Sequence, residues 1–170
     1  MVNLIYNYAE IVIRRAQLSE VDTIREIIKE AYAPIKKQLS RTPGALQENL
    51  SKISRHIQMG TQYVALVGDT VAGCMRVQMR GHIGVISRVA VRNSFRNRRI
   101  GTRLLEYGEN LLDHMNANFI EIEVYGAVEE QKNFYEKMGY EEIERTVREE
   151  EEIVVMRKSL IEEDIIEEEV

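Results

Sequence analysis

The chain has 170 residues, enough for one domain with a sizeable core, and its 44% hydrophobic and 30% charged content is typical of a soluble globular protein. No apolar run is long enough to span a bilayer and no signal peptide opens the chain, so we expect a cytoplasmic protein with no membrane partner. The single Cys74 can form no internal disulfide, and its position in a strand-like run predicts a buried apolar residue rather than a nucleophile.

The net charge of −5 conceals an asymmetry along the chain. Residues 141–170 contain thirteen acidic and four basic residues, which leaves a net charge of +4 on residues 1–140. We expect residues 1–160 to form a single domain and residues 161–170 to form a solvated acidic tail.

The first third of the chain predicts one strand and two helices. Residues 11–14 read as a short strand. A helix follows, capped by Ser19 and ended or kinked near Pro34, because the residue before a proline disfavours helical dihedrals. Apolar residues at helical spacing then predict one amphipathic helix over residues 46–57.

The rest of the chain contains most of the predicted sheet. Strands are expected over residues 63–67, 71–78, 85–91, 119–124, 141–147 and 153–158. Helices are expected from about Gly101 to Met115 and from about Val128 to Met138, the second ending at the glycine cap Gly139. This order predicts an α/β protein of mixed α+β type, with a mixed, mostly antiparallel sheet and helices on both faces.

The turn between the strand 85–91 and the helix near Gly101 is the most informative segment. Helix starts expose unpaired N–H groups and a partial positive charge, which attract phosphate. Six arginines reinforce this turn, namely Arg88, Arg92, Arg96, Arg98, Arg99 and Arg103. Gly101 lets a ligand approach the main chain without meeting a Cβ. We predict a site for a polyanionic small molecule; the alternative is a surface loop with solubilising arginines.

Two segments, Arg96 to Thr102 and Asn133 to Tyr140, together resemble the GNAT-type N-acetyltransferase family. The family's cofactor loop reads Arg/Gln-x-x-Gly-x-Gly/Ala, and its later helix ends in a phrase close to FYEKLGF. Arg96 takes the first position of the loop and Gly101 that of the second glycine, whereas Arg99 stands in place of the first glycine. Three further positions depart from the family pattern: Asn93 for a proline, Thr102 for a small residue, and Val128 for an asparagine seven residues before the tyrosine.

The resemblance implies the GNAT acetyltransferase fold, acetyl-CoA (coenzyme A) as co-substrate, and transfer of an acetyl group to a primary amine by direct attack on the thioester. It also implies that the loop holds the pyrophosphate and that the preceding strand pairs with pantetheine. The cofactor-binding residues implied are Val89, Ala90, Val91, Arg96, Asn97, Arg98, Arg99, Ile100, Gly101 and Thr102. Acceptor contacts in this family come from the first two helices and their connection, which here spans Tyr32 to Gln47.

Tyr135 takes the position of the family's tyrosine that protonates the departing thiolate; the alternative is an aromatic packing residue. A phenol titrates at about 10 and a thiol at about 8.5, so tyrosine carries its proton at neutral pH. Glu121 and Glu123 share one face of a strand beside the cofactor strand, so either can accept the amine proton, or both can form a solvated acidic face. His56, His82 and His114 lack metal-ligand spacing and are expected on the surface or in loops, and we expect no metal.

Two other functions stay open from the sequence. One is a domain that binds or senses acyl-CoA without turnover, and the other is a nucleic-acid-binding module that uses the arginine cluster. The acidic tail and the lack of interleaved aromatic residues speak against nucleic acid as a partner. The expected partner is a small-molecule or peptide amine, and a homodimer through exposed C-terminal strands is possible. The acceptor and the acyl chain length stay open.

Overall fold

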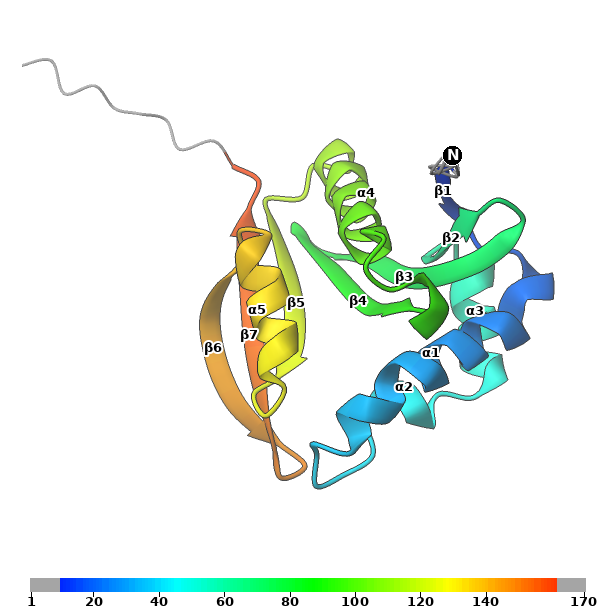
Figure 1. Cartoon of the computed structure of the whole chain (residues 1–170). Helices are drawn as coiled ribbons and strands as arrows, with labels where there is room; N and C mark the ends of the chain where they lie inside the picture. The colour runs from blue at the N-terminus through cyan, green and yellow to red at the C-terminus, as the bar shows by residue number, and fades with distance from the viewer. Residues whose placement is uncertain (1–9, 162–170) are drawn as a thin grey trace, which may run out of the picture.

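The structure, a computed structural model, describes residues 10–161. One seven-stranded sheet runs through these residues in the order β1-β2-β3-β4-β5-β7-β6 (Figure 1). Its strands are β1 (Ile11–Arg15), β2 (Gln62–Val67), β3 (Thr70–Arg80), β4 (Ile83–Val91), β5 (Phe119–Tyr125), β6 (Glu141–Arg148) and β7 (Glu151–Ser159). The helices are α1 (Val21–Lys36), α2 (Gly44–Gln47), α3 (Leu50–Gln58), α4 (Ile100–His114) and α5 (Glu129–Lys137). All neighbouring strands are antiparallel except β4 and β5, so the mixed, mostly antiparallel sheet is confirmed.

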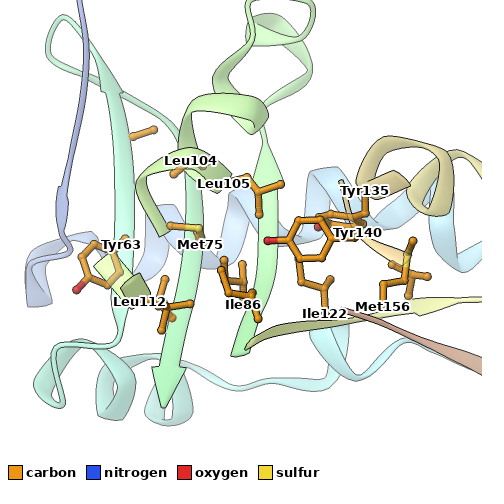
Figure 2. Packing of buried hydrophobic residues seen from close by; sticks show 14 of the residues in the cluster. Tyr63, Met75, Ile86, Leu104, Leu105, Leu112, Ile122, Tyr135, Tyr140 and Met156 are labelled. Carbon is orange, nitrogen blue, oxygen red and sulfur yellow. The ribbon is translucent and has the colours of Figure 1, made fainter. Parts of the chain in front are cut away.

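Helices pack on both faces of this sheet, as the sequence predicts, and each face has its own core. On one face, Leu104 and Leu112 of α4 and Tyr135 of α5 pack over the sheet residues Ile86 and Ile122 (Figure 2). On the other face, the apolar stripes of α1 and α3 pack over β2, β3 and the end of β4. Figure 1 shows α4 and α1 on opposite sides of β3 and β4.

The start and the end of α1 differ from the prediction. Ser19 does not cap the helix: it lies within a short 3-10 helix (Leu18–Glu20), and the carboxylate of Glu20 accepts from the Gln17 main-chain N–H at 2.8 Å. Pro34 does not end the helix, which continues to Lys36. The missing N–H of Pro34 removes one helical hydrogen bond, and only two residues of the helix follow it.

The single helix predicted over residues 46–57 is wrong, because the chain leaves the helical conformation between α2 and α3. Glu48 is extended, with φ −68° and ψ 128°. Asn49 then caps α3, since its Oδ1 accepts from the Lys52 main-chain N–H at 2.9 Å. An asparagine side chain satisfies one of the free amides of a new helix, which favours a helix start over continuation.

Several expectations concern the ends of the sheet and of the chain. The acidic tail 161–170 lies, apart from Ile161, outside the described residues. The side chains of β6, at one edge of the sheet, are exposed, and the homodimer stays a prediction. Within residues 10–161, no helix is both long and apolar enough to cross a membrane, and no group of three His, Cys, Asp or Glu side chains is placed to hold a metal ion.

The contact between β4 and α4 leaves no room for a side chain at Gly84, where an added Cβ would lie 2.6 Å from Leu112 Cδ1. We therefore expect Gly84→Ala to lower the free energy of unfolding by about 1–3 kcal/mol, measured by urea denaturation. Gly44→Ala is the control, because its Cβ would meet Arg88 Nη2 only at 3.6 Å, an ordinary contact. Wild-type stability in Gly84→Ala would contradict this packing.

Candidate active site

The site begins where β4 and β5 separate. The two strands pair in parallel at only three positions, Ile83–Phe119, Gly84–Ile120 and Val85–Glu121. Both strands continue beyond this point, β4 to Val91 and β5 to Tyr125, and they diverge as they do so (Figure 1). The main-chain groups on this side of β4, from residue 86 onward, therefore have no strand partner within residues 10–161. Such an unpaired edge can bind an extended ligand as an added strand.

A β-bulge in β4 decides which side chains face which side of the sheet. Cys74 pairs with Ala90 and Arg76 with Ser87, so Arg88 and Val89 together lie opposite the single residue Met75. Arg88 has a φ of +53°. The extra residue shifts the alternation by one position, so that Val89 packs on the α4 side while the Arg88 side chain lies on the α1 side.

The loop before α4 presents a run of free main-chain amides. Asn97 and Arg99 are left-handed, with φ values of +62° and +61°, and Arg99 is the N-cap of α4. The amides from Asn97 to Thr102 donate to no main-chain acceptor in the described part of the chain. Arg99, at the position of the family's first glycine, thus keeps the conformation that glycine favours. Free amides at the start of a long helix can bind an anion, and the predicted anion site at this loop stays a prediction.

Only four of the six arginines lie where they can serve this loop. Arg96, Arg98, Arg99 and Arg103 are exposed around the start of α4. Arg92 instead donates from Nε to the Val71 carbonyl oxygen at 2.9 Å, which braces β3. The bulge directs Arg88 to the opposite face, so the expectation that it reinforces the turn is wrong.

A cleft of about 840 Å³ lies between the diverging strands. It is lined by parts of β3, β4, β5, β6 and β7, by α1 and α5, and by the segment between α1 and α3. Tyr135 belongs to the core on the α4 face and Tyr32 to the core on the α1 face, yet both line the cleft. The gap between β4 and β5 therefore connects the two faces of the sheet.

The segment between α1 and α3, for which acceptor contacts are expected, contributes part of the cleft wall, and its acceptor role stays a prediction. Of the predicted stretch, Tyr32 and the residues 41–44 line the cleft, whereas Pro34, Lys36 and Lys37 do not. The main-chain amide of Arg41 donates to Glu151 Oε1 at 3.0 Å. This contact joins the α1–α2 connection to the start of β7 at the mouth of the cleft.

Tyr135 lies at the junction of the aromatic core and the cleft. Its side chain is 8% exposed, and its ring lies 5.1 Å from that of Phe134 and 5.8 Å from that of Tyr140 between centroids. Figure 2 shows Tyr135 beside Tyr140. Burial, with a smaller contribution from Tyr32, raises the pKa of the Tyr135 phenol above its ordinary value. The hydroxyl therefore keeps its proton at neutral pH. Its role as the proton donor stays a prediction.

Glu121 and Glu123 both line the cleft, and each is held by an arginine from a later strand. Glu121 accepts from Arg157 Nε at 3.1 Å. Glu123 accepts from both terminal nitrogens of Arg148, at 3.0 and 3.1 Å. Both hydrogen bonds to Glu121 go to Oε1, so its Oε2 stays available to accept a proton, and each oxygen of Glu123 accepts one hydrogen bond and keeps a second acceptor position. The base role stays a prediction.

Sequence reasoning missed the most deeply buried charge of the cleft, Glu48. Its side chain is 2% exposed and accepts from Arg76 at 2.8 and 3.0 Å and from Arg88 Nε at 2.9 Å. Burial opposes its ionisation, but the hydrogen bonds from Arg76 and the charge of Arg88 outweigh that effect and lower the pKa of Glu48 to about 2. The one local signal for this site was the capping residue Asn49.

Two further polar residues of the cleft were also missed. His56 is buried rather than on the surface, with Nδ1 2.9 Å from Thr61 Oγ1, and its pKa is lowered by burial and by Arg76. His82 and His114 are exposed, as expected. Gln131, one turn before Tyr135 on α5, has a buried Oε1 with no hydrogen-bond partner among the described residues. This atom is available to a ligand in the cleft.

Residues 21–140 match the model of the acetyltransferase (GNAT) family. The chain belongs to the GNAT acetyltransferase family. The family and fold predicted from the sequence are therefore confirmed, and with them the expectation of an acetyltransferase. No curated protein matches the chain significantly.

Solved structures of GNAT proteins share the fold at low sequence identity. The PaiA N-acetyltransferase of Thermoplasma acidophilum, in complex with coenzyme A, has a TM-score of 0.77 at 15% identity, over 88% of this chain and 99% of that one. The ribosomal-protein-S18-alanine N-acetyltransferase of Escherichia coli has a TM-score of 0.73 at 15% identity, over 92% of this chain and 99% of that one. YncA, a putative acetyltransferase from Salmonella typhimurium with acetyl-CoA, has a TM-score of 0.72 at 13% identity, over 91% of this chain and 96% of that one.

The buried Glu48 predicts a specific dependence of stability on pH. Its folded pKa of about 2 lies below the ordinary value of 4.5, so its contribution is complete above pH 4.5 and is lost as the pH falls toward 2. We expect Glu48→Gln to lower the free energy of unfolding by roughly 2–4 kcal/mol at pH 7. The difference from wild type should become progressively smaller as the pH falls below 4.5. Urea denaturation between pH 2.5 and 7 measures this difference.

Glu106→Gln, on the exposed face of α4, is the control for this series and should change stability by less than about 0.5 kcal/mol throughout. A constant difference between wild type and Glu48→Gln across the pH range would show that the Glu48 carboxylate is not stabilised by folding.

Proposed function

We propose that this protein is an acetyl-CoA-dependent N-acetyltransferase that transfers the acetyl group to a primary amine by direct attack on the thioester. One observation carries the proposal: β4 and β5 separate next to the free amides at the start of α4, and the cleft between them is lined by residues of both faces of the sheet. A cofactor bound on one face can therefore present its thioester to an amine that enters from the other.

The residues around this gap fit coenzyme A. The amides from Asn97 to Thr102 would bind the pyrophosphate, with exposed arginines adding charge-assisted hydrogen bonds. The unpaired edge of β4, including Val89, Ala90 and Val91, would pair with the amides of the pantetheine arm. The buried Oε1 of Gln131 offers one more acceptor on the α5 side. Acetyl-CoA supplies the activated acetyl thioester.

The chain's own residues supply the proton transfers and the positioning. A main-chain N–H of β4 would stabilise the negative charge that develops on the acetyl oxygen. Glu121 or Glu123 would accept the proton that the amine loses as its C–N bond forms. Tyr135, protonated in its buried site, would donate a proton to the sulfur as the C–S bond breaks. No covalent enzyme intermediate is needed, because positioning brings the amine and the thioester together.

The loop conformation predicts how substitutions at Arg99 affect cofactor binding. Arg99→Gly retains the left-handed conformation and loses one charge, so we expect about a threefold to tenfold weaker Kd for coenzyme A in isothermal titration calorimetry. Arg99→Val loses the same charge and also places a β-branched residue at a φ of +61°, so it should bind markedly more weakly than Arg99→Gly.

Equal affinities for the two Arg99 variants would show that the conformation of this residue does not matter. If the wild-type protein did not bind coenzyme A at millimolar concentration and low salt, the proposed function would be wrong.

The proposed role of Tyr135 predicts that its substitution slows turnover without weakening the binding of coenzyme A. We expect Tyr135→Phe to reduce turnover about 10²-fold, because the leaving thiolate loses its proton donor, while the Kd for coenzyme A changes by less than about twofold. Thiol release over a panel of amines measures the rate. Tyr140→Phe is the matched control, since Tyr140 belongs to the same aromatic cluster and does not line the cleft. Wild-type turnover in Tyr135→Phe would show that Tyr135 is not the proton donor.

A further inference from the structure

Arg88 presents an unused pair of hydrogen-bond donors to the acceptor side of the cleft. Its Nε donates to Glu48, but its two terminal nitrogens donate to no acceptor among the described residues. The side chain is 25% exposed and lines the cleft. A guanidinium held by its Nε and free at the other two nitrogens can bind a carboxylate with both of them.

The charges beneath Arg88 make this part of the cleft attractive to an anion. The single carboxylate of Glu48 is shared by Arg76 and Arg88, and Lys52 Nζ lies 3.6 Å from it. Three cations thus surround one buried anion, which leaves a net positive charge at this wall. Arg76 is buried, so Arg88 and the half-exposed Lys52 present this charge to a ligand, and of these two only Arg88 has the planar guanidinium that can bind a carboxylate with two nitrogens.

The opposite wall of the cleft has a net negative charge. Glu121 and Glu123 of β5 and Glu144 of β6 line it, and the arginines paired there are Arg157 and Arg148. Three carboxylates against two guanidinium groups leave this wall negative. The cleft is therefore dipolar across the gap between β4 and β5, where the amine has to reach the thioester.

Arg88 is also separated from the cofactor loop. The bulge directs its side chain to the α1 face, whereas the amides of Asn97 to Thr102 lie at the start of α4 on the other face. Tyr32 of α1 lies close enough to Arg88 for this cation to oppose the rise that burial causes in the pKa of the phenol. Arg88 thus belongs to the acceptor side and is not free for the phosphates of coenzyme A.

We infer that Arg88 anchors an anionic group of the acceptor, and that the preferred acceptors are amines that carry a carboxylate near the amino group. This inference rests on the proposed acetyl transfer. The amine would lie toward Glu121 and Glu123, and the carboxylate would bind the terminal nitrogens of Arg88. Free amino acids and peptide N-termini followed by an acidic residue share this chemistry.

The test compares matched acceptors in the wild-type protein. We expect β-alanine to exceed propylamine, and alanine to exceed alaninamide, by about 10- to 100-fold in kcat/KM, the range of one charge-assisted interaction. The peptides Ala-Asp-Gly-amide and Ala-Asn-Gly-amide separate the peptide source from the free amino acid source. Equal or better use of the neutral member in every pair would overturn the inference.

Variants assign the preference to Arg88 itself. Arg88→Gln should raise the KM for carboxylated amines about 10- to 100-fold more than the KM for neutral amines, so that the preference for the carboxylated member of each pair is lost. Arg88→Lys retains one positive charge and should be intermediate. Arg55→Gln, an exposed arginine of α3 outside the cleft, is the control and should keep the full preference. A full preference in Arg88→Gln would overturn the assignment.

Binding experiments separate this inference from the proposed function. Calorimetry with β-alanine and with propylamine, each in the presence of coenzyme A, measures the preference without any turnover. If no amine is acetylated, the proposed function fails, while tighter binding of β-alanine still supports the anion site. If Arg88→Gln does not fold, as judged by its melting temperature and its Kd for coenzyme A, the wild-type acceptor pairs and Arg88→Lys still decide the inference.

Discussion

The hydrogen-bonded, buried carboxylate of Glu48 is the interaction on which the shape of the candidate active site depends. It joins three segments that are distant in the sequence: the break between α2 and α3, the strand β3 through Arg76, and the bulge of β4 through Arg88. A buried carboxylate costs several kcal/mol of desolvation unless its oxygens are fully hydrogen-bonded, and here two guanidinium groups supply those bonds. Glu48 therefore fixes where the helices of the α1 face meet the strand that borders the cleft.

The bulge and the divergence of β4 from β5 act together. Divergence alone would leave β4 with an unpaired edge. Without the bulge, the side chains of β4 would alternate regularly between the two faces of the sheet along the whole strand. The extra residue at Arg88 reverses this alternation, so Val89 joins the core under α4 while Arg88 reaches Glu48 on the other side. One strand thereby offers its main chain at the gap and a charged side chain to the opposite face.

The features that the sequence predicted are those encoded locally. Alternating apolar residues revealed the strands, and Gly139, which has a φ of +94°, marked the end of α5. The site residues that were missed depend on contacts between distant segments. Glu48 lies 28 residues before Arg76 and 40 before Arg88, and the arginine that pairs with Glu121 comes 36 residues after it. No local pattern indicates such pairings, because they arise only when the sheet assembles. The break before Asn49 was predictable, since asparagine at a helix start is a local signal.

Arg99 shows that a loop's conformation can persist when its usual residue does not. A left-handed non-glycine residue costs about 1–2 kcal/mol, and such a residue is retained only where the surrounding structure determines the conformation. Here the 3-10 turn at Asn93–Phe95 and the start of α4 hold both ends of the loop, and Glu30 of α1 accepts from the Asn93 main-chain N–H at 2.6 Å. With the main chain held in this way, an arginine at position 99 retains the free amides and adds an exposed positive charge beside them. The departure from the glycine pattern thus adds a positive charge at the proposed anion site, while Arg99 retains the left-handed conformation that glycine favours.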